Sequence, residues 1–101
     1  MGPKVVAHTG DIAPKTMIGA KVDGTGVLIA NIESTFYAIT SKCTHMGCNL
    51  SEGFLHGNTV TCPCHGSQFN VTNGQVVHGP AKNPERSLSI RVEDGKIAID
   101  L

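Results

Sequence analysis

Two short runs that combine cysteine with histidine constrain this chain more than any other feature. They are Cys43-Thr44-His45-Met46-Gly47-Cys48 and Cys62-Pro63-Cys64-His65-Gly66-Ser67. Thiolate sulfur and imidazole nitrogen are ligands for zinc, for copper and for the iron of iron–sulfur clusters. Each run has a glycine after its histidine, and glycine allows backbone angles and close approaches that a Cβ atom would block. The sequence therefore predicts a metal centre built from two loops, each of which supplies one sulfur and one nitrogen.

The chain on either side of these runs has the pattern of short β-strands separated by turn residues. Turns are indicated at Asp23-Gly24-Thr25-Gly26, at Glu33-Ser34-Thr35 and at Asp94-Gly95, and Asp11-Ile12-Ala13-Pro14 is better interpreted as a turn than as a helix. The expected strands are residues 4–8, 17–22, 27–32, 36–40, 88–93 and 97–100. We therefore expect an all-β fold, a small antiparallel barrel or sandwich.

The middle of the chain differs in composition from its two ends. All four cysteines and four of the five histidines fall between Ser41 and Asn83. Rigid scaffolds usually present chemistry on loops. A chain of 101 residues fits a single domain. We therefore expect one domain over residues 1–101, with a β platform at about 4–40 and 84–101 and a loop-rich subdomain at about 41–83 that carries the two cysteine/histidine runs.

Charge and hydropathy exclude several classes of protein. Eight basic and eight acidic residues give a formal net charge of zero, so there is neither a basic field for nucleic acid nor a polybasic membrane patch. No stretch approaches the roughly 20 apolar residues of a membrane helix. The first ten residues lack the pattern of a signal peptide. We expect a protein that is cytoplasmic or otherwise soluble, with no membrane segment and no nucleic-acid partner.

The spacing of the two runs resembles a known motif. Cys-x-His, then sixteen residues, then Cys-x-x-His is similar to the cluster-binding motif of the Rieske family of [2Fe–2S] proteins. Further segments fall where Rieske ferredoxins carry similar residues, so the resemblance covers nearly the whole chain. These segments are Asp11-Ile12-Ala13-Pro14, Phe36-Tyr37-Ala38, Leu50-Ser51-Glu52-Gly53, Phe69-Asn70 and Gly79-Pro80-Ala81.

The resemblance implies one [2Fe–2S] cluster with mixed ligands. Cys43 and Cys62 would hold the buried iron, and His45 and His65 would hold the outer iron near the surface. Neutral imidazoles in place of two thiolates remove negative charge from the site. Reduction then becomes easier, and the potential rises to about −150 to +300 mV, against about −400 mV for plant-type ferredoxins.

The resemblance also implies roles for residues around the cluster. Gly79-Pro80-Ala81 would be the loop that covers one side of the cluster, and Ser67 would donate a hydrogen bond to a cluster sulfur. Respiratory relatives carry tyrosine two residues after that serine, whereas this chain has Phe69 and so lacks one donor. Cys48 and Cys64 match the subgroup with a bridging disulfide, found in the cytochrome bc and b6f complexes and in arsenite oxidase small subunits. The residues alone also allow Cys48 and Cys64 to be free buried thiols.

The implied function is one-electron transfer. The sequence has no nucleotide-binding loop and no nucleophile–base arrangement, so we expect an electron carrier rather than an enzyme. Its partners would be redox proteins, either a reductase, a terminal oxidase or oxygenase, or both. The carrier would be a monomer. Two alternatives stay open: a detachable Rieske subunit of a larger arsenite-oxidase-like or dioxygenase system, and a zinc-stabilised interaction module. The zinc hypothesis fits the spacing poorly, because zinc sites usually use C-x₂₋₄-C and H-x₃₋₅-H pairs.

The other histidines, His8, His56 and His78, are expected at the surface. For His78, tuning of the cluster is an alternative.

Overall fold

The structure, a computed structural model, describes residues 4–43, 48–64, 66–79 and 81–100. Six longer strands lie near the two ends of the chain: β1 (Lys4–His8), β2 (Thr16–Val22), β3 (Thr25–Ile32), β4 (Thr35–Thr40), β9 (Ser87–Glu93) and β10 (Lys96–Asp100). Four short strands lie between them: β5 (Phe54–His56), β6 (Thr59–Thr61), β7 (Gln68–Asn70) and β8 (Val76–His78). Helical structure within the described ranges is limited to two 3₁₀ helices, η1 (Thr9–Asp11) and η2 (Leu50–Glu52). The prediction of an all-β fold is confirmed.

The six longer strands form one antiparallel sheet in the order β1-β10-β9-β4-β3-β2. β1 and β2, the two ends of this order, also contact each other, so the sheet nearly closes into a barrel. All six strands were predicted, with bounds that differ from the observed ones by at most two residues. The 3₁₀ helix η1 ends at Asp11, which is the first residue of the turn expected at Asp11–Pro14.

Three hairpin turns of this sheet have positive φ at both central residues. Asp23 and Gly24 connect β2 to β3 with φ of 51° and 83°, and Asp94 and Gly95 connect β9 to β10 with φ of 51° and 74°. Such turns match the twist of the flanking strands and favour Asp-Gly. The β3–β4 turn carries no glycine. There Ser34 has φ of 72°, and its backbone amide donates to Asn31 Oδ1 at 2.9 Å, which stabilises the turn.

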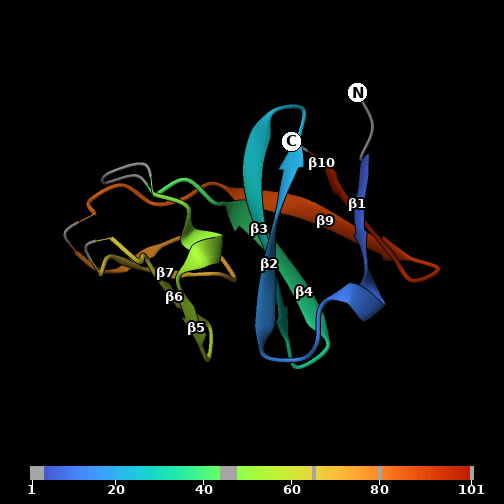
Figure 1. Cartoon of the computed structure of the whole chain (residues 1–101), viewed down its shortest axis with the longest axis horizontal. Helices are drawn as coiled ribbons and strands as arrows, with labels where there is room; N and C mark the ends of the chain where they lie inside the picture. The colour runs from blue at the N-terminus through green and yellow to red at the C-terminus, as the bar shows by residue number, and fades with distance from the viewer. Residues whose placement is uncertain (1–3, 44–47, 65, 80, 101) are drawn as a thin grey trace.

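The four short strands form a second antiparallel sheet in the order β5-β6-β7-β8. It lies beside the larger sheet (Figure 1). The sequence predicted this region only as loop-rich, because strands of three residues are too short to show an alternating pattern. Its strands all fall within residues 41–83, while the division of the chain into a platform and a cluster-binding subdomain stays a prediction.

The buried apolar residues form two clusters. One, the platform core, lies among the strands of the larger sheet: Ala7, Ile12, Val22, Val27, Ile29, Ala38, Leu88, Ile97 and Ile99. The other, the site-side core, contains both unpaired cysteines: Leu28, Ala30, Ile39, Cys43, Leu50, Val60, Cys62, Phe69, Val71 and Ala81.

Strand β3 contributes to both cores. Successive side chains of a strand point to opposite faces. Val27 and Ile29 therefore belong to the platform core, while Leu28 and Ala30 belong to the site-side core. A strand that is buried on both faces has a continuous apolar sequence, as Val27–Ala30 does. β3 thus connects the barrel-like sheet directly to the region that carries the cysteines.

Candidate metal centre

Each of the two predicted ligand loops is closed by a backbone hydrogen bond, and the two bonds occupy equivalent positions. The amide of Cys43 donates to the carbonyl of Cys48 at 2.7 Å, and the amide of Cys62 donates to the carbonyl of Ser67 at 2.7 Å. Each bond spans six residues and brings the ends of its loop together. The first loop leaves β4 and is tied again at its base, where the amide of Leu50 donates to the carbonyl of Ser41 at 2.6 Å. The second loop connects β6 to β7, which are paired strands. Both loops therefore start from fixed backbone.

The first cysteine of each loop is a buried free thiol. Cys43 and Cys62 are each 2% exposed, and neither forms a disulfide. Both belong to the site-side core, whose other members include the buried apolar residues Leu50, Phe69 and Ala81. Thiolates are the ligands that iron–sulfur clusters use, and apolar surroundings limit the access of water to them. These two sulfurs fit the sulfur half of a mixed Cys/His ligand set.

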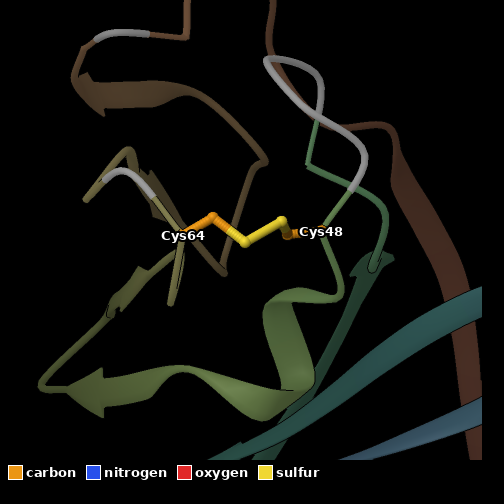
Figure 2. The surroundings of a disulfide bond; sticks show 2 residues. All are labelled: Cys48 and Cys64. Atoms are coloured by element: carbon orange, nitrogen blue, oxygen red, sulfur yellow. A yellow bond between two sulfur atoms is a disulfide. The ribbon is translucent and has the colours of Figure 1, made fainter.

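The structure joins Cys48 and Cys64 in a disulfide. Their Cα atoms are 6.5 Å apart, and the bond connects the end of the first loop to the middle of the second (Figure 2). The bridge implied by the family resemblance is therefore present, whereas membership of the disulfide-containing subgroup stays a prediction. Cys64 is exposed and Cys48 is half-buried. The Cys64 end of the bridge is therefore accessible from the surface.

Ser67 connects the second ligand loop to the segment that follows position 80. Its hydroxyl oxygen is fully buried and accepts a hydrogen bond from the backbone amide of Ala81 at 3.0 Å. A hydroxyl can accept one hydrogen bond and donate another, so this contact leaves the Ser67 proton for a further acceptor. Gly79, on the other side of position 80, is exposed. The predicted covering segment is therefore fastened to the ligand loop through a serine side chain.

The remaining predicted site residues divide into two groups. His45, His65 and Pro80 lie outside the described residues. The other histidines, His8, His56 and His78, are all exposed, as expected. Phe69, at the position where respiratory relatives carry tyrosine, is fully buried on β7.

Sequence reasoning missed a buried polar contact at the base of the first loop. Thr40, the last residue of β4, donates its hydroxyl proton to Glu85 Oε1 at 2.6 Å and accepts from the amide of Arg86 at 3.0 Å. The amide of Glu85 in turn donates to the carbonyl of Gly74 at 2.8 Å. Glu85 is only 4% exposed. Its place between Pro84 and Arg86 gives no sign of burial, so no sequence signal identifies it.

Comparison with known proteins agrees with this geometry. The chain matches the Rieske [2Fe–2S] domain family over residues 2–96. It is 36% identical over 83 residues to the 3-phenylpropionate/cinnamic acid dioxygenase ferredoxin subunit of Escherichia coli (strain K12), covering 80% of this chain and 78% of that protein.

Solved structures show the same architecture. The ferredoxin of carbazole 1,9a-dioxygenase from Nocardioides aromaticivorans IC177 superposes with a TM-score of 0.93 at 27% identity, covering 98% of this chain and 97% of that one. A chain in the complex of reduced oxygenase and oxidized ferredoxin of carbazole 1,9a-dioxygenase superposes with a TM-score of 0.90 at 30% identity, covering 96% and 91%.

The family match favours an iron–sulfur centre over a zinc-stabilised module. No helix in the described part of the chain is long and apolar enough to cross a membrane. The two closed loops, their buried thiols and the match over residues 2–96 lead to one assignment. The chain belongs to the Rieske [2Fe–2S] domain family, as a one-electron carrier with one [2Fe–2S] cluster rather than an enzyme.

Proposed function

We propose that Cys43, His45, Cys62 and His65 hold the cluster, and that the chain carries single electrons from a reductase to an oxygenase. The observation that carries this proposal is the pair of loops closed by equivalent hydrogen bonds, each starting with a buried free thiol. The second potential ligand of each loop, a histidine, follows its first cysteine by two or three positions. In each loop, the proposed sulfur and nitrogen donors are therefore close in sequence.

The surroundings of the thiols account for what the protein contributes to electron transfer. Bound there, the cluster supplies a one-electron couple at a higher potential than an all-cysteine cluster, because two of its ligands are neutral. The site-side core keeps water from Cys43 and Cys62, which are each 2% exposed. The Ser67 hydroxyl, whose oxygen accepts from the Ala81 amide, would donate its own proton to a cluster sulfur and so favour the more negative, reduced state. The disulfide limits the relative motion of the loops and with it the reorganisation that accompanies reduction.

The choice of partner is supported by the relatives. The relative from Escherichia coli is a ferredoxin subunit of a dioxygenase, and one structural neighbour is part of a complex of oxygenase with ferredoxin. We extend this to the present chain: a monomeric, cytoplasmic carrier that docks on the oxygenase component of a multicomponent system. The same carrier would receive its electrons from a separate reductase.

Electron paramagnetic resonance of the reduced protein, combined with a redox titration, tests this proposal. One-electron reduction leaves an unpaired electron on the cluster, so a paramagnetic signal is expected that titrates with a potential in the range of about −150 to +300 mV. A potential near that of plant-type ferredoxins, about −400 mV, would contradict the mixed ligand set. Electron transfer to a purified oxygenase component, followed by the rate of cluster reoxidation, tests the choice of partner separately.

A further inference from the structure

Three sulfur atoms of the candidate centre lie unusually close together. The Sγ atoms of Cys48, Cys62 and Cys64 are all within 4.8 Å of one another. Cys48 and Cys64 form the disulfide, while Cys62 is a buried free thiol and one of the proposed cluster ligands. The disulfide is therefore in contact range of a cysteine that the cluster needs.

This arrangement fits a soft metal ion once the disulfide is open. The Zn–S distance is about 2.3 Å, so two sulfurs on one tetrahedral zinc are about 3.8 Å apart. Reduction allows the bonded sulfurs of Cys48 and Cys64 to move apart to this separation, and Cys62 Sγ already lies within 4.8 Å of both, so small side-chain movements suffice. A fourth position on the ion can be filled by water.

We propose that Cys48, Cys62 and Cys64 form a thiolate site for a soft ion of the zinc class in the chain that lacks both disulfide and cluster. We further propose that the disulfide closes this site and so reserves Cys62 for iron. A dithiol reductant opens the site: its two thiols are oxidised to a disulfide, and Cys48 and Cys64 become thiols. The ion then binds three thiolates, and the three thiol protons pass to solvent. The site itself does not depend on the cluster assignment, whereas the reservation of Cys62 rests on the proposed function.

The backbone keeps the three thiols together after reduction. The Cys43–Cys48 and Cys62–Ser67 hydrogen bonds close both loops without the disulfide. Cys64 is exposed, so a reductant and an ion can approach from the surface, while Cys62 provides a fixed ligand in the core. Zinc binds a nitrogen or sulfur site more tightly than ferrous iron does. A chain with all three thiols free would therefore load zinc in place of iron, and the disulfide removes two of the three competing ligands.

Cadmium titration of the cluster-free full-length chain tests the site. One sample keeps the disulfide, and a second is reduced with a phosphine, which is then removed under anaerobic conditions. The reduced chain is expected to bind one cadmium ion, with ultraviolet thiolate-to-cadmium charge-transfer absorption corresponding to three thiolates, and zinc is expected to displace this signal. The disulfide-containing chain is expected to show no such three-thiolate signal. Equal signals from the two samples would overturn the proposal.

Alkylation identifies the thiols without any substitution. Cadmium should slow the alkylation of Cys48, Cys62 and Cys64 in the reduced wild-type chain and leave the alkylation rate of Cys43 unchanged. As matched variants, Cys64→Ser should lose the three-thiolate signal and Cys43→Ser should retain it. If Cys43→Ser loses the signal as completely as Cys64→Ser, the ion is held by the proposed cluster ligands and the three-cysteine site is wrong.

Reconstitution tests the reservation of Cys62. Iron and sulfide are added to both samples with and without an equimolar amount of zinc. Zinc should block cluster formation in the reduced chain and leave it largely unaffected in the disulfide-containing chain. Equal inhibition of both samples would overturn the protective role of the disulfide. The zinc-free reaction of the disulfide-containing chain reports separately on the proposed function, because failure there would contradict the cluster ligands themselves.

Discussion

The backbone amide of Ala81 donates a hydrogen bond of 3.0 Å to the hydroxyl oxygen of Ser67. The contact joins two segments that are 14 residues apart in the sequence and both buried. It orients the serine, because an oxygen that accepts from Ala81 must direct its own proton elsewhere. One side chain can therefore fasten the covering segment and also donate to the cluster.

Ser67→Ala tests both roles. Removal of a donor to sulfur destabilises the reduced cluster, so the potential should fall. Loss of the acceptor for the buried Ala81 amide should lower the free energy of unfolding by about 1–3 kcal/mol. Ser89→Ala, on the exposed face of β9, is the matched control and should change neither quantity. An unchanged potential in Ser67→Ala would show that its proton does not reach a cluster sulfur.

Substitution of the proposed ligands should abolish the native centre. Cys62→Ser and His65→Ala remove one sulfur and one nitrogen donor, so the visible absorption and the bound iron and sulfide should be lost. His78→Ala provides the control, because His78 is exposed on β8 and lies outside the two loops. Iron and sulfide contents in His65→Ala equal to those of the wild type would exclude His65 as a ligand.

The Cys48–Cys64 bridge should stabilise the loops around the centre. It closes a loop with a sequence separation of 16, which in the chain-entropy model corresponds to about 3 kcal/mol. The double variant Cys48→Ser/Cys64→Ser should lose about this amount of unfolding free energy, as measured by denaturant titration. Addition of a reductant should destabilise the wild type similarly and leave the double variant unchanged. If the reductant destabilises the wild type and the double variant equally, its effect does not come from reduction of the Cys48–Cys64 bridge.

Gly53 is expected to tolerate no side chain. A Cβ atom at this position would overlap the backbone carbonyl oxygen of Thr61, the residue before Cys62. Gly53→Ala should therefore displace β5 from β6 and lower the free energy of unfolding by about 1–3 kcal/mol, with reduced cluster content in the purified protein. At Gly10 a Cβ atom has no neighbour within 4 Å, so Gly10→Ala is the control. Thermal unfolding compares the two, and equal melting temperatures would contradict the prediction.

The Thr40–Glu85 contact should matter for the base of the first loop. Thr40→Val keeps the shape of the side chain but removes the hydroxyl that donates to Glu85 and accepts from Arg86. A loss of about 1–3 kcal/mol in unfolding free energy is expected, because the buried Glu85 carboxylate loses one of its hydrogen bonds and the Arg86 amide loses its bond to Thr40. Thr40→Ser retains the hydroxyl and should recover most of the loss. Equal stability of the valine and serine variants would show that the hydroxyl contributes nothing.

The larger sheet could be predicted because its signals are local. Asp23-Gly24 and Asp94-Gly95 adopt the positive φ values that such turns require, and the strands beside them alternate or form apolar runs. The second sheet could not be predicted in this way. Its strands have three residues each, and their pairing depends on the loops that bring Phe54 opposite Thr61 and Val60 opposite Phe69.

The residue types of the candidate centre could be predicted from the sequence, but the burial and contacts of the residues around it could not. The spacing of cysteine and histidine identifies the two loops, and the structure closes both in the same way. The burial of Glu85 depends on contacts with Thr40 and Gly74, which are 45 and 11 positions away. A sequence pattern read over short windows contains no information about such partners.

Strand β3 has a consequence for how this protein can change in evolution. Its alternate residues Val27 and Ile29 pack in one core, and Leu28 and Ala30 pack in the other, so the strand has no face on which substitutions can accumulate freely. A change of side-chain volume at Leu28 alters the packing beside the cysteines, and the same change one residue later alters the barrel-like sheet. Descendants of this sequence that acquire new redox partners should therefore diverge mainly in their loops, while this segment keeps its apolar residues.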